Sequence, residues 1–448
     1  MMMKIYKSLC HNKSFYPIYM TYNMTLQLVL YFIRFFSMIM KYLKINMVLF
    51  IISLAYVSLF FSAAIDTDKM TFYYFPMFVS NQIYYLFFVI LTMLISLQSI
   101  NYLKIYKIDL QFFIFTILFC ILMLKHYTDT GSTRLLTTVF YMYYYFIGRL
   151  VFYIKNIRFM SIVNVMFFIS IIHIIVSILK LVADRYDLGP DLLLIGSQIG
   201  GSNYLGAFNG RASGLFFSPL TLSSFLIIPF FLGLYTFIHE NKYYKFIFFM
   251  IFIGILLALS RGTVIAIIFG LLMLVLSSKI KYHSIAKYLK ILIYMVIVFA
   301  IISQAVSLHR FIDQKTFLSS GGSRLLVLLK DSEIFLSNYS NIFFGSSNFQ
   351  LGSDNDFMTL LFTIGIPLMA FLCFIVFKLT YEIKSNNKIS KYFAAAIFAK
   401  FIESNIAGSS WGPPTSFFIF LILGYLYTEK KEMIRNRNMG TYLIKHGN

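Results

Sequence analysis

The sequence predicts an all-α polytopic membrane protein of about twelve transmembrane helices with two long loops on one face. Of its 448 residues, 59% are hydrophobic and only 12% are charged, which leaves too little polar surface for a water-soluble fold. Apolar runs long enough to cross about 30 Å of hydrocarbon recur along most of the chain. The predicted spans are residues 45–65, 82–100, 110–125, 135–154, 159–182, 214–238, 245–260, 263–279, 288–307, 356–377, 392–408 and 415–428.

The pattern divides the chain into three parts. Residues 1–44 hold a polar start and a short apolar run with Arg34, and we expect them to be cytoplasmic or interfacial. Residues 45–428 form a single transmembrane helical domain, and residues 429–448 form a basic cytoplasmic tail. No small-residue cleavage site precedes the first spans, which are therefore expected to act as an uncleaved signal.

Charge gives the orientation. The formal net charge is +21, which in a soluble protein would favour nucleic acid as a partner. Here most basic residues lie in short connections on one side, so we expect no nucleic acid. The positive-inside rule makes that side cytoplasmic, with both termini on it. The residues that set this bias are Lys41, Lys44, Lys104, Lys107, Lys155, Arg158, Lys242, Lys245, Lys279, Lys281, Lys287, Lys290, Lys378, Lys384, Lys388, Lys391 and the segment 430–437.

Two connections on the opposite, periplasmic side are long, at residues 183–213 and 308–355. Connections in compact bundles are usually short, so long ones are candidates for function. The three cysteines are far apart and no metal-ligand spacing or P-loop is present. We therefore expect neither a metal nor a cofactor.

Three arginines, Arg211, Arg261 and Arg324, break the orientation bias, because they fall on the periplasmic side. An arginine at membrane depth is costly unless it is paired or solvated, which makes each one a candidate functional residue. The guanidinium group suits phosphate oxygens, and the neighbouring glycines let backbone N–H groups approach the same anion. The alternatives are snorkelling to the interface and a structural ion pair.

Two carboxylates, Asp354 and Asp356, precede the span that contains Gly365 and Pro367. A carboxylate with a raised pKa at the membrane edge can accept a proton from a sugar hydroxyl, so both are candidate catalytic residues. Asp356 is an equally good helix cap.

For the polar residues inside the apolar runs, the pattern favours structural roles. Glu403 has Lys400 one turn before it, which indicates a structural pair, and His173 inside a span is more often packed than a ligand. Six loop residues are weaker candidates for the functional site. Asp184, Asp187 and Asp191 could contact sugars but are usually just solvated, and an amphipathic surface helix would account for His309, Arg310 and Asp313.

At these motifs the sequence resembles the O-antigen polymerase and ligase superfamily, over about residues 180–370. The resemblance is carried by residues 210–219, Ser260-Arg261-Gly262, Gly322-Ser323-Arg324 and Asp354-Asn355-Asp356 followed by Gly365. It implies a GT-C-like architecture in the bacterial inner membrane. It also implies metal-independent, inverting transfer of a glycan from undecaprenyl diphosphate, with the matching arginines holding the diphosphate.

Ligases of this superfamily carry a His-Asn pair where this chain has Asp354-Asn355, which favours a polymerase in lipopolysaccharide biosynthesis. Its donor and acceptor would be lipid-linked repeat units, and a chain-length regulator would be a possible partner. Whether Asp354 is the base or only orients the acceptor stays open, because an exposed aspartate is a weak base. The alternatives are an O-antigen ligase that transfers glycan to the lipopolysaccharide core, a flippase or transporter of lipid-linked oligosaccharide, and a membrane scaffold.

Overall fold

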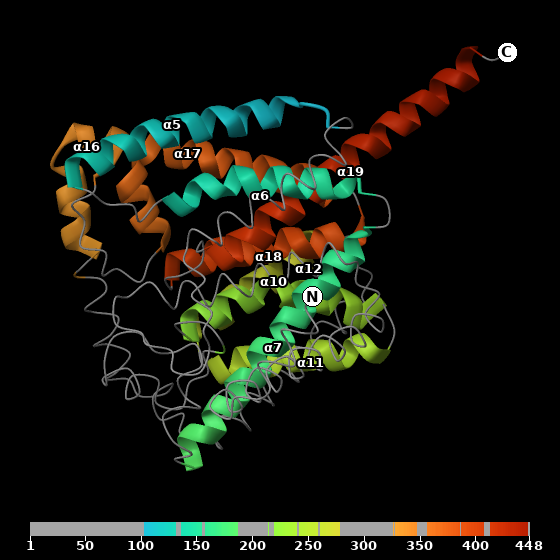
Figure 1. The fold of residues 1–448 in the computed structure, drawn as a ribbon, viewed down its shortest axis with the longest axis horizontal. Coiled ribbons are helices and arrows are strands. Elements are labelled where there is room, and N and C mark those ends of the chain that lie inside the picture. The colour runs from blue at the N-terminus through green and yellow to red at the C-terminus, as the bar shows by residue number, and fades with distance from the viewer. Residues whose placement is uncertain are drawn as a thin grey trace, which may run out of the picture.

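A computed structural model describes residues 103–130, 136–154, 157–186, 214, 219–239, 242–258, 260–277, 326, 328–346, 356–385, 387–406 and 413–446. The described part of the chain is helical throughout its regular structure (Figure 1). The helices are α5 (Lys107–Thr130), α6 (Leu136–Phe152), α7 (Phe159–Tyr186), α10 (Pro219–His239), α11 (Lys242–Ala258), α12 (Arg261–Ser277), α16 (Tyr339–Phe344), α17 (Asp356–Lys384), α18 (Lys388–Ile406) and α19 (Pro413–His446).

The chain is a multi-pass membrane protein. Four described helices have an apolar stretch long enough to cross a membrane, within α5, α7, α10 and α17, and α11 and α12 are shorter apolar helices. One face of α5 leaves large apolar side chains such as Phe113, Ile117 and Ile121 exposed, which fits contact with lipid. Helices are present at nine of the predicted spans, and four of these helices are long and apolar enough to cross a membrane. The predicted spans 45–65, 82–100 and 288–307 lie outside the described residues.

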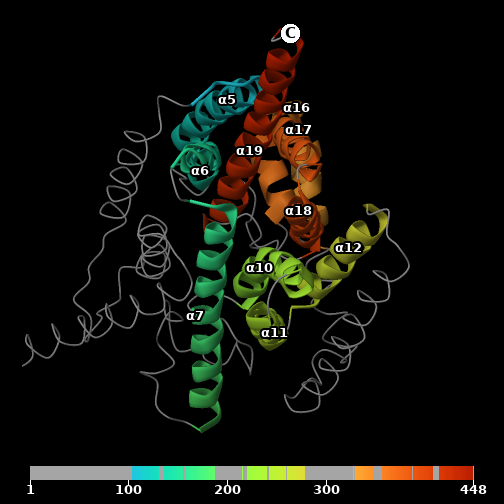
Figure 2. The same ribbon diagram turned by 90° about the vertical axis from the view of Figure 1, so that its right-hand side faces the viewer.

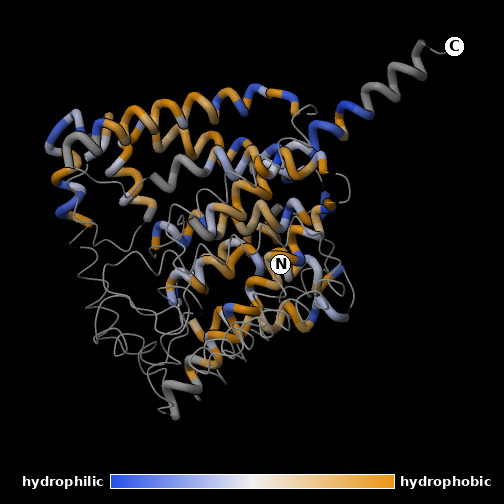
Figure 3. The backbone as a smooth tube through the Cα atoms, in the orientation of Figure 1, coloured by the Kyte–Doolittle hydropathy of each residue, from blue (hydrophilic) through white to orange (hydrophobic). Residues whose placement is uncertain are grey.

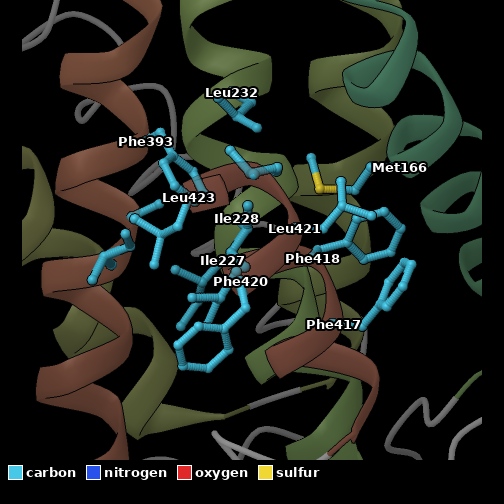
Figure 4. Packing of buried hydrophobic residues seen from close by; sticks show 14 of the residues in the cluster. Met166, Ile227, Ile228, Leu232, Phe393, Phe417, Phe418, Phe420, Leu421 and Leu423 are labelled. Carbon is cyan, nitrogen blue, oxygen red and sulfur yellow. The ribbon is translucent and has the colours of Figure 1, made fainter. Parts of the chain in front are cut away.

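α18 lies between α10 and α12 on one side and α17 on the other, and α19 packs along α6 (Figures 1 and 2). The core is built from large apolar side chains of several helices. Figure 4 shows Met166 of α7, Ile228 of α10, Phe393 of α18 and Phe418 of α19 pointing into one cluster. α18 therefore lies at the centre of the described bundle, in contact with α10, α12 and α17.

α6 and α19 approach each other backbone to backbone. A Cβ added at Gly148 would collide with the carbonyl oxygen of Leu421, and one added at Gly424 would collide with that of Tyr145. Small residues are what allow such close packing of membrane helices. The two glycines therefore set the distance between these helices.

α17 is bent at Gly365, where φ is 78° and ψ is 166°, values that favour glycine. The bend lies against Gly345, just after α16, and the backbone N–H of Ser346 donates to the carbonyl of Phe362 at 2.9 Å. The span predicted over 356–377 is present as α17, which bends within its length and runs on to Lys384.

One end of the bundle, here named the basic end, is where α5 and α18 begin and α6 and α17 end. Asp109 pairs with Arg149 there, and the Nζ of Lys431 on α19 lies 2.9 Å from the Glu382 carboxylate of α17. Asn387, just before α18, donates to Glu429 of α19 at 3.3 Å. Hydrophilic residues lie at this end and also at the opposite end, with hydrophobic stretches between them (Figure 3). The structure thus places several of the lysine-bearing connections together.

Two predicted boundaries differ from the structure. The tail predicted from residue 429 onward is not separated from the span before it, because α19 continues as one helix to His446 and projects beyond the other helices (Figures 1 and 2). The predicted loop 308–355 contains helical residues at 328–336 and α16.

Candidate functional site

A buried polar cluster, the α18 cluster, ties three helices together at the end of the bundle where α18 ends. Its centre is Glu403, which has no exposed surface. One carboxylate oxygen accepts a hydrogen bond from Thr263 of α12 at 3.1 Å. The other accepts from Ser224 of α10 at 2.9 Å and from Lys400 at 2.8 Å. The structural pair predicted for Lys400 and Glu403 is confirmed.

Lys400 is also fully buried, and its ammonium group has its remaining partners on α10. It donates to the backbone carbonyl of Ser224 at 3.0 Å and to the hydroxyl of the same residue. An ammonium has three N–H bonds, so Glu403 and these two oxygens use all of them. The pair is therefore satisfied internally, which is the condition for burying two charges away from water.

The cluster reaches the start of α12, where Arg261 is the first helical residue. The Ser260 hydroxyl accepts from the backbone N–H of Thr263 at 3.4 Å, in the manner of a helix N-cap. The hydroxyls of Ser260 and Ser223 each lie 3.0 Å from the Thr263 hydroxyl. Arg261 is partly exposed and stands at the positive end of the α12 dipole, where anions are favoured.

The predicted site residues fall into two groups. Arg261 is the first residue of α12 and Asp356 is the first residue of α17. Arg211, Arg324 and Asp354 lie outside the described residues.

The flanks of two motifs meet α18 directly. Thr263, two residues after Arg261, bonds Glu403. Phe357, next to Asp356, packs edge-on against Phe401 of α18, with the ring centroids 5.2 Å apart. The starts of α12 and α17 therefore lie on either side of the last turns of α18.

The flank of Arg211 reaches the same region through α10. Gly214 follows Arg211 by three positions and lies against His173 of α7, since an added Cβ would come within 3.0 Å of its Nδ1. The His173 ring lies 5.7 Å from that of Phe225, next to Ser224 of the α18 cluster. His173 is fully buried, which agrees with its predicted role as a packed residue.

The flank of Arg324 packs on the first part of α17. Phe335, in the helical stretch 328–336, lies 5.0 Å from the ring of Phe362. Asp331 in this stretch is only 3% exposed, and burial raises the pKa of its carboxyl group above the ordinary value. Asp331 could not be picked out from the sequence, because an aspartate beside a lysine such as Lys330 is usually solvated.

The arrangement limits what Glu403 can do. Its carboxylate already accepts three hydrogen bonds and has no exposed surface, so it is not placed to take a proton from a substrate. Among the described residues, no three His, Cys, Asp or Glu side chains gather closely enough to hold a metal ion. The hydroxyls of Ser224 and Thr263 were not predicted as cluster members. Their only signal was a polar residue inside an apolar run.

A cavity between α17 and α18 is lined by carbon and sulfur alone, including Phe357, Cys373 and Phe401. Its volume is about 20 Å³, too small for a sugar. This space is a packing gap and holds none of the predicted site residues.

Comparison of the sequence with models of known protein families finds no match, and comparison with curated proteins finds none either. The resemblance to the O-antigen polymerase and ligase superfamily therefore rests on the motif residues and their order in the sequence.

Proposed function

We propose that the protein is an O-antigen polymerase. It would join undecaprenyl-diphosphate-linked repeat units by inverting, metal-independent glycosyl transfer at the periplasmic face of the bacterial inner membrane. The observation that supports this proposal is the meeting of the motif flanks around α18. Thr263, two residues after Arg261, and Phe357, next to Asp356, both contact the last turns of α18. Ser224 of α10, the helix that follows the Arg211 motif in the chain, contacts the same turns.

The chemistry of the donor fits cations at that end. As the glycosidic bond breaks, negative charge develops on the departing lipid diphosphate, and preorganised cations there lower the barrier. Arg261 adds a guanidinium to the positive end of a helix. In this proposal Arg211 and Arg324 complete the anion site, as the resemblance implies.

The acceptor needs a group on the other face of the donor sugar. An inverting transfer uses one carboxylate as a general base opposite the leaving group. Asp356 begins α17 and Asp354 precedes it by two residues in the sequence, so in this proposal either one orients or deprotonates the acceptor hydroxyl. A site at helix ends also leaves the lipid tail in hydrocarbon while the sugars stay in water.

The direct test uses purified protein in vesicles with one defined lipid-linked repeat unit and mass analysis of the products. Oligomers on undecaprenyl diphosphate support the proposal. Product that forms only after lipopolysaccharide core is added would identify a ligase instead. Movement of intact repeat units between leaflets without any new glycosidic bond would identify a flippase and refute transfer.

Substitution locates the site. We expect Arg261→Ala to lower elongation by about 10²–10³-fold, the usual effect of removing a charge-stabilising group. Arg261→Lys should lose less, because it keeps the charge but not the bidentate fork. The parallel changes Arg211→Ala and Arg324→Ala should behave like Arg261→Ala, with normal protein levels in the membrane. Arg158→Ala is the matched control, since Arg158 is exposed beside the start of α7. Equal activity of Arg261→Ala and Arg158→Ala would contradict the assignment.

A further inference from the structure

We infer that the Lys400–Glu403 pair is a positioning device for Arg261: by holding the first turn of α12 against α10, it sets where the guanidinium group stands. The inference rests on the proposed function in so far as Arg261 binds the diphosphate. Neither Lys400 nor Glu403 touches the substrate in this account. Both act through Thr263 and the helix start that it belongs to.

The contacts of α12 show how the pair would act. Thr263 donates its single hydroxyl proton to Glu403, and the hydroxyls of Ser260 and Ser223 approach the same oxygen. Ser260 precedes Arg261 and Thr263 follows it by two residues, so the network fixes the chain on both sides of the arginine. On the other side of the pair lies Ser224 of α10. Its hydroxyl donates to Glu403, and its backbone carbonyl accepts from Lys400.

Stability alone gives little reason for this arrangement. Replacing a buried ion pair by apolar residues of similar volume is often neutral or stabilising for a fold. The polar cluster positions helices more precisely than apolar packing does. Each hydrogen bond fixes a distance and an angle between two residues, and together the bonds join α10, α12 and α18. Transfer reactions depend on such placement, and an error of 1 Å at a reacting group can cost about 10²-fold in rate.

The first test is the apolar double variant Lys400→Met/Glu403→Leu. We expect it to unfold at the temperature of the wild type or above, yet to elongate glycan about 10²-fold more slowly. The loss should appear mainly as a lower kcat/KM for the lipid-linked donor, because the contact between Arg261 and the diphosphate is displaced. Wild-type elongation in the folded double variant would overturn the inference.

A smaller change keeps the inference testable if the double variant does not fold. Thr263→Val removes only the hydroxyl group and should lower elongation about tenfold, whereas Thr263→Ser should retain it. Thr236→Val is the matched control, because Thr236 is equally buried on α10 but bonds only its own helix, at the Gly233 carbonyl. Equal activity of Thr263→Val and Thr236→Val would overturn the inference.

A second measurement does not need glycan transfer. Arg261→Cys, in a chain whose three natural cysteines are replaced by serine, can be labelled with a membrane-impermeant methanethiosulfonate. With Lys400 and Glu403 in place the labelling rate reports the held helix start, and the apolar double variant should change it several-fold. An unchanged labelling rate overturns the positioning role. Absence of oligomers from the unaltered chain would instead overturn the proposed function and leave the labelling result to stand.

Discussion

Replacing Arg149 by methionine tests how the basic end of the bundle is held together. The arginine is fully buried on α6 and pairs with Asp109 at the start of α5. It also donates to the hydroxyl of Thr428 on α19 at 3.2 Å and to the carbonyl of Lys104. Its guanidinium carbon lies 4.9 Å from the ring centroid of Tyr106. One side chain thus connects α5, α6 and α19.

The magnitude follows from what the substitution leaves behind. In Arg149→Met, Asp109 keeps hydrogen bonds from the Tyr145 hydroxyl at 2.9 Å and the Tyr106 N–H at 2.6 Å. It loses its opposite charge while it stays only 2% exposed. Breaking a buried pair in this way costs about 3–5 kcal/mol, whereas replacing both partners by apolar groups is often nearly neutral. We therefore expect Arg149→Met to be far less stable than Asp109→Leu/Arg149→Met.

The assay is reversible unfolding in mixed micelles, followed by far-ultraviolet circular dichroism for the wild type, both single variants and the double variant. The cycle should give a coupling energy of about 2 kcal/mol or more between the two sites. Additive effects, or an Arg149→Met protein within about 1 kcal/mol of the wild type, would refute the view that the buried charge depends on this partner.

Three further changes test separate parts of the fold. Gly424→Ala should destabilise the protein by about 1–3 kcal/mol, because the new Cβ would meet the Tyr145 carbonyl. Gly233→Ala is its control, with the nearest atom, on Phe248, at 3.3 Å, and similar losses in both would contradict the close approach of α6 and α19. Gly365→Ala should cost about 1–3 kcal/mol because φ there is 78°, and an unchanged melting temperature would argue against the bend. Asp331→Asn tests pH dependence: since the folded pKa is raised, wild-type stability should fall as pH rises from about 4, and the variant should be the more stable at pH 7. A variant that is less stable than the wild type at pH 7 would show that the Asp331 carboxylate has a stabilising partner.

The helices could be predicted because each needs only local information. An apolar run of some twenty residues bounded by polar ones reads as a membrane helix whatever its neighbours are. This is why the predicted span 159–182 lies within α7 and 214–238 nearly coincides with α10. The bend in α17 was harder to predict. Gly365 and Pro367 are visible in the sequence, but the bend also depends on Gly345 lying against it from a distant segment.

The candidate site could be predicted only as separate motifs. The sequence marked Arg261 by its place on the less basic side, and it paired Glu403 with Lys400 by their spacing. It did not show that the same carboxylate also bonds Thr263 and Ser224. Spacing along one helix predicts partners on that helix alone, whereas contacts between helices depend on how the helices pack.

The sequence by itself determined that this chain is a membrane protein, where its helices lie and which connections carry the basic residues. It could do so because hydrophobicity and charge are properties of each residue along the chain. Only the tertiary structure decided that α10, α12 and α18 share one buried ion pair, and that α17 begins beside them. The physical reason is that burying a charge requires partners in three dimensions. Packing of whole helices, rather than any local pattern, supplies those partners.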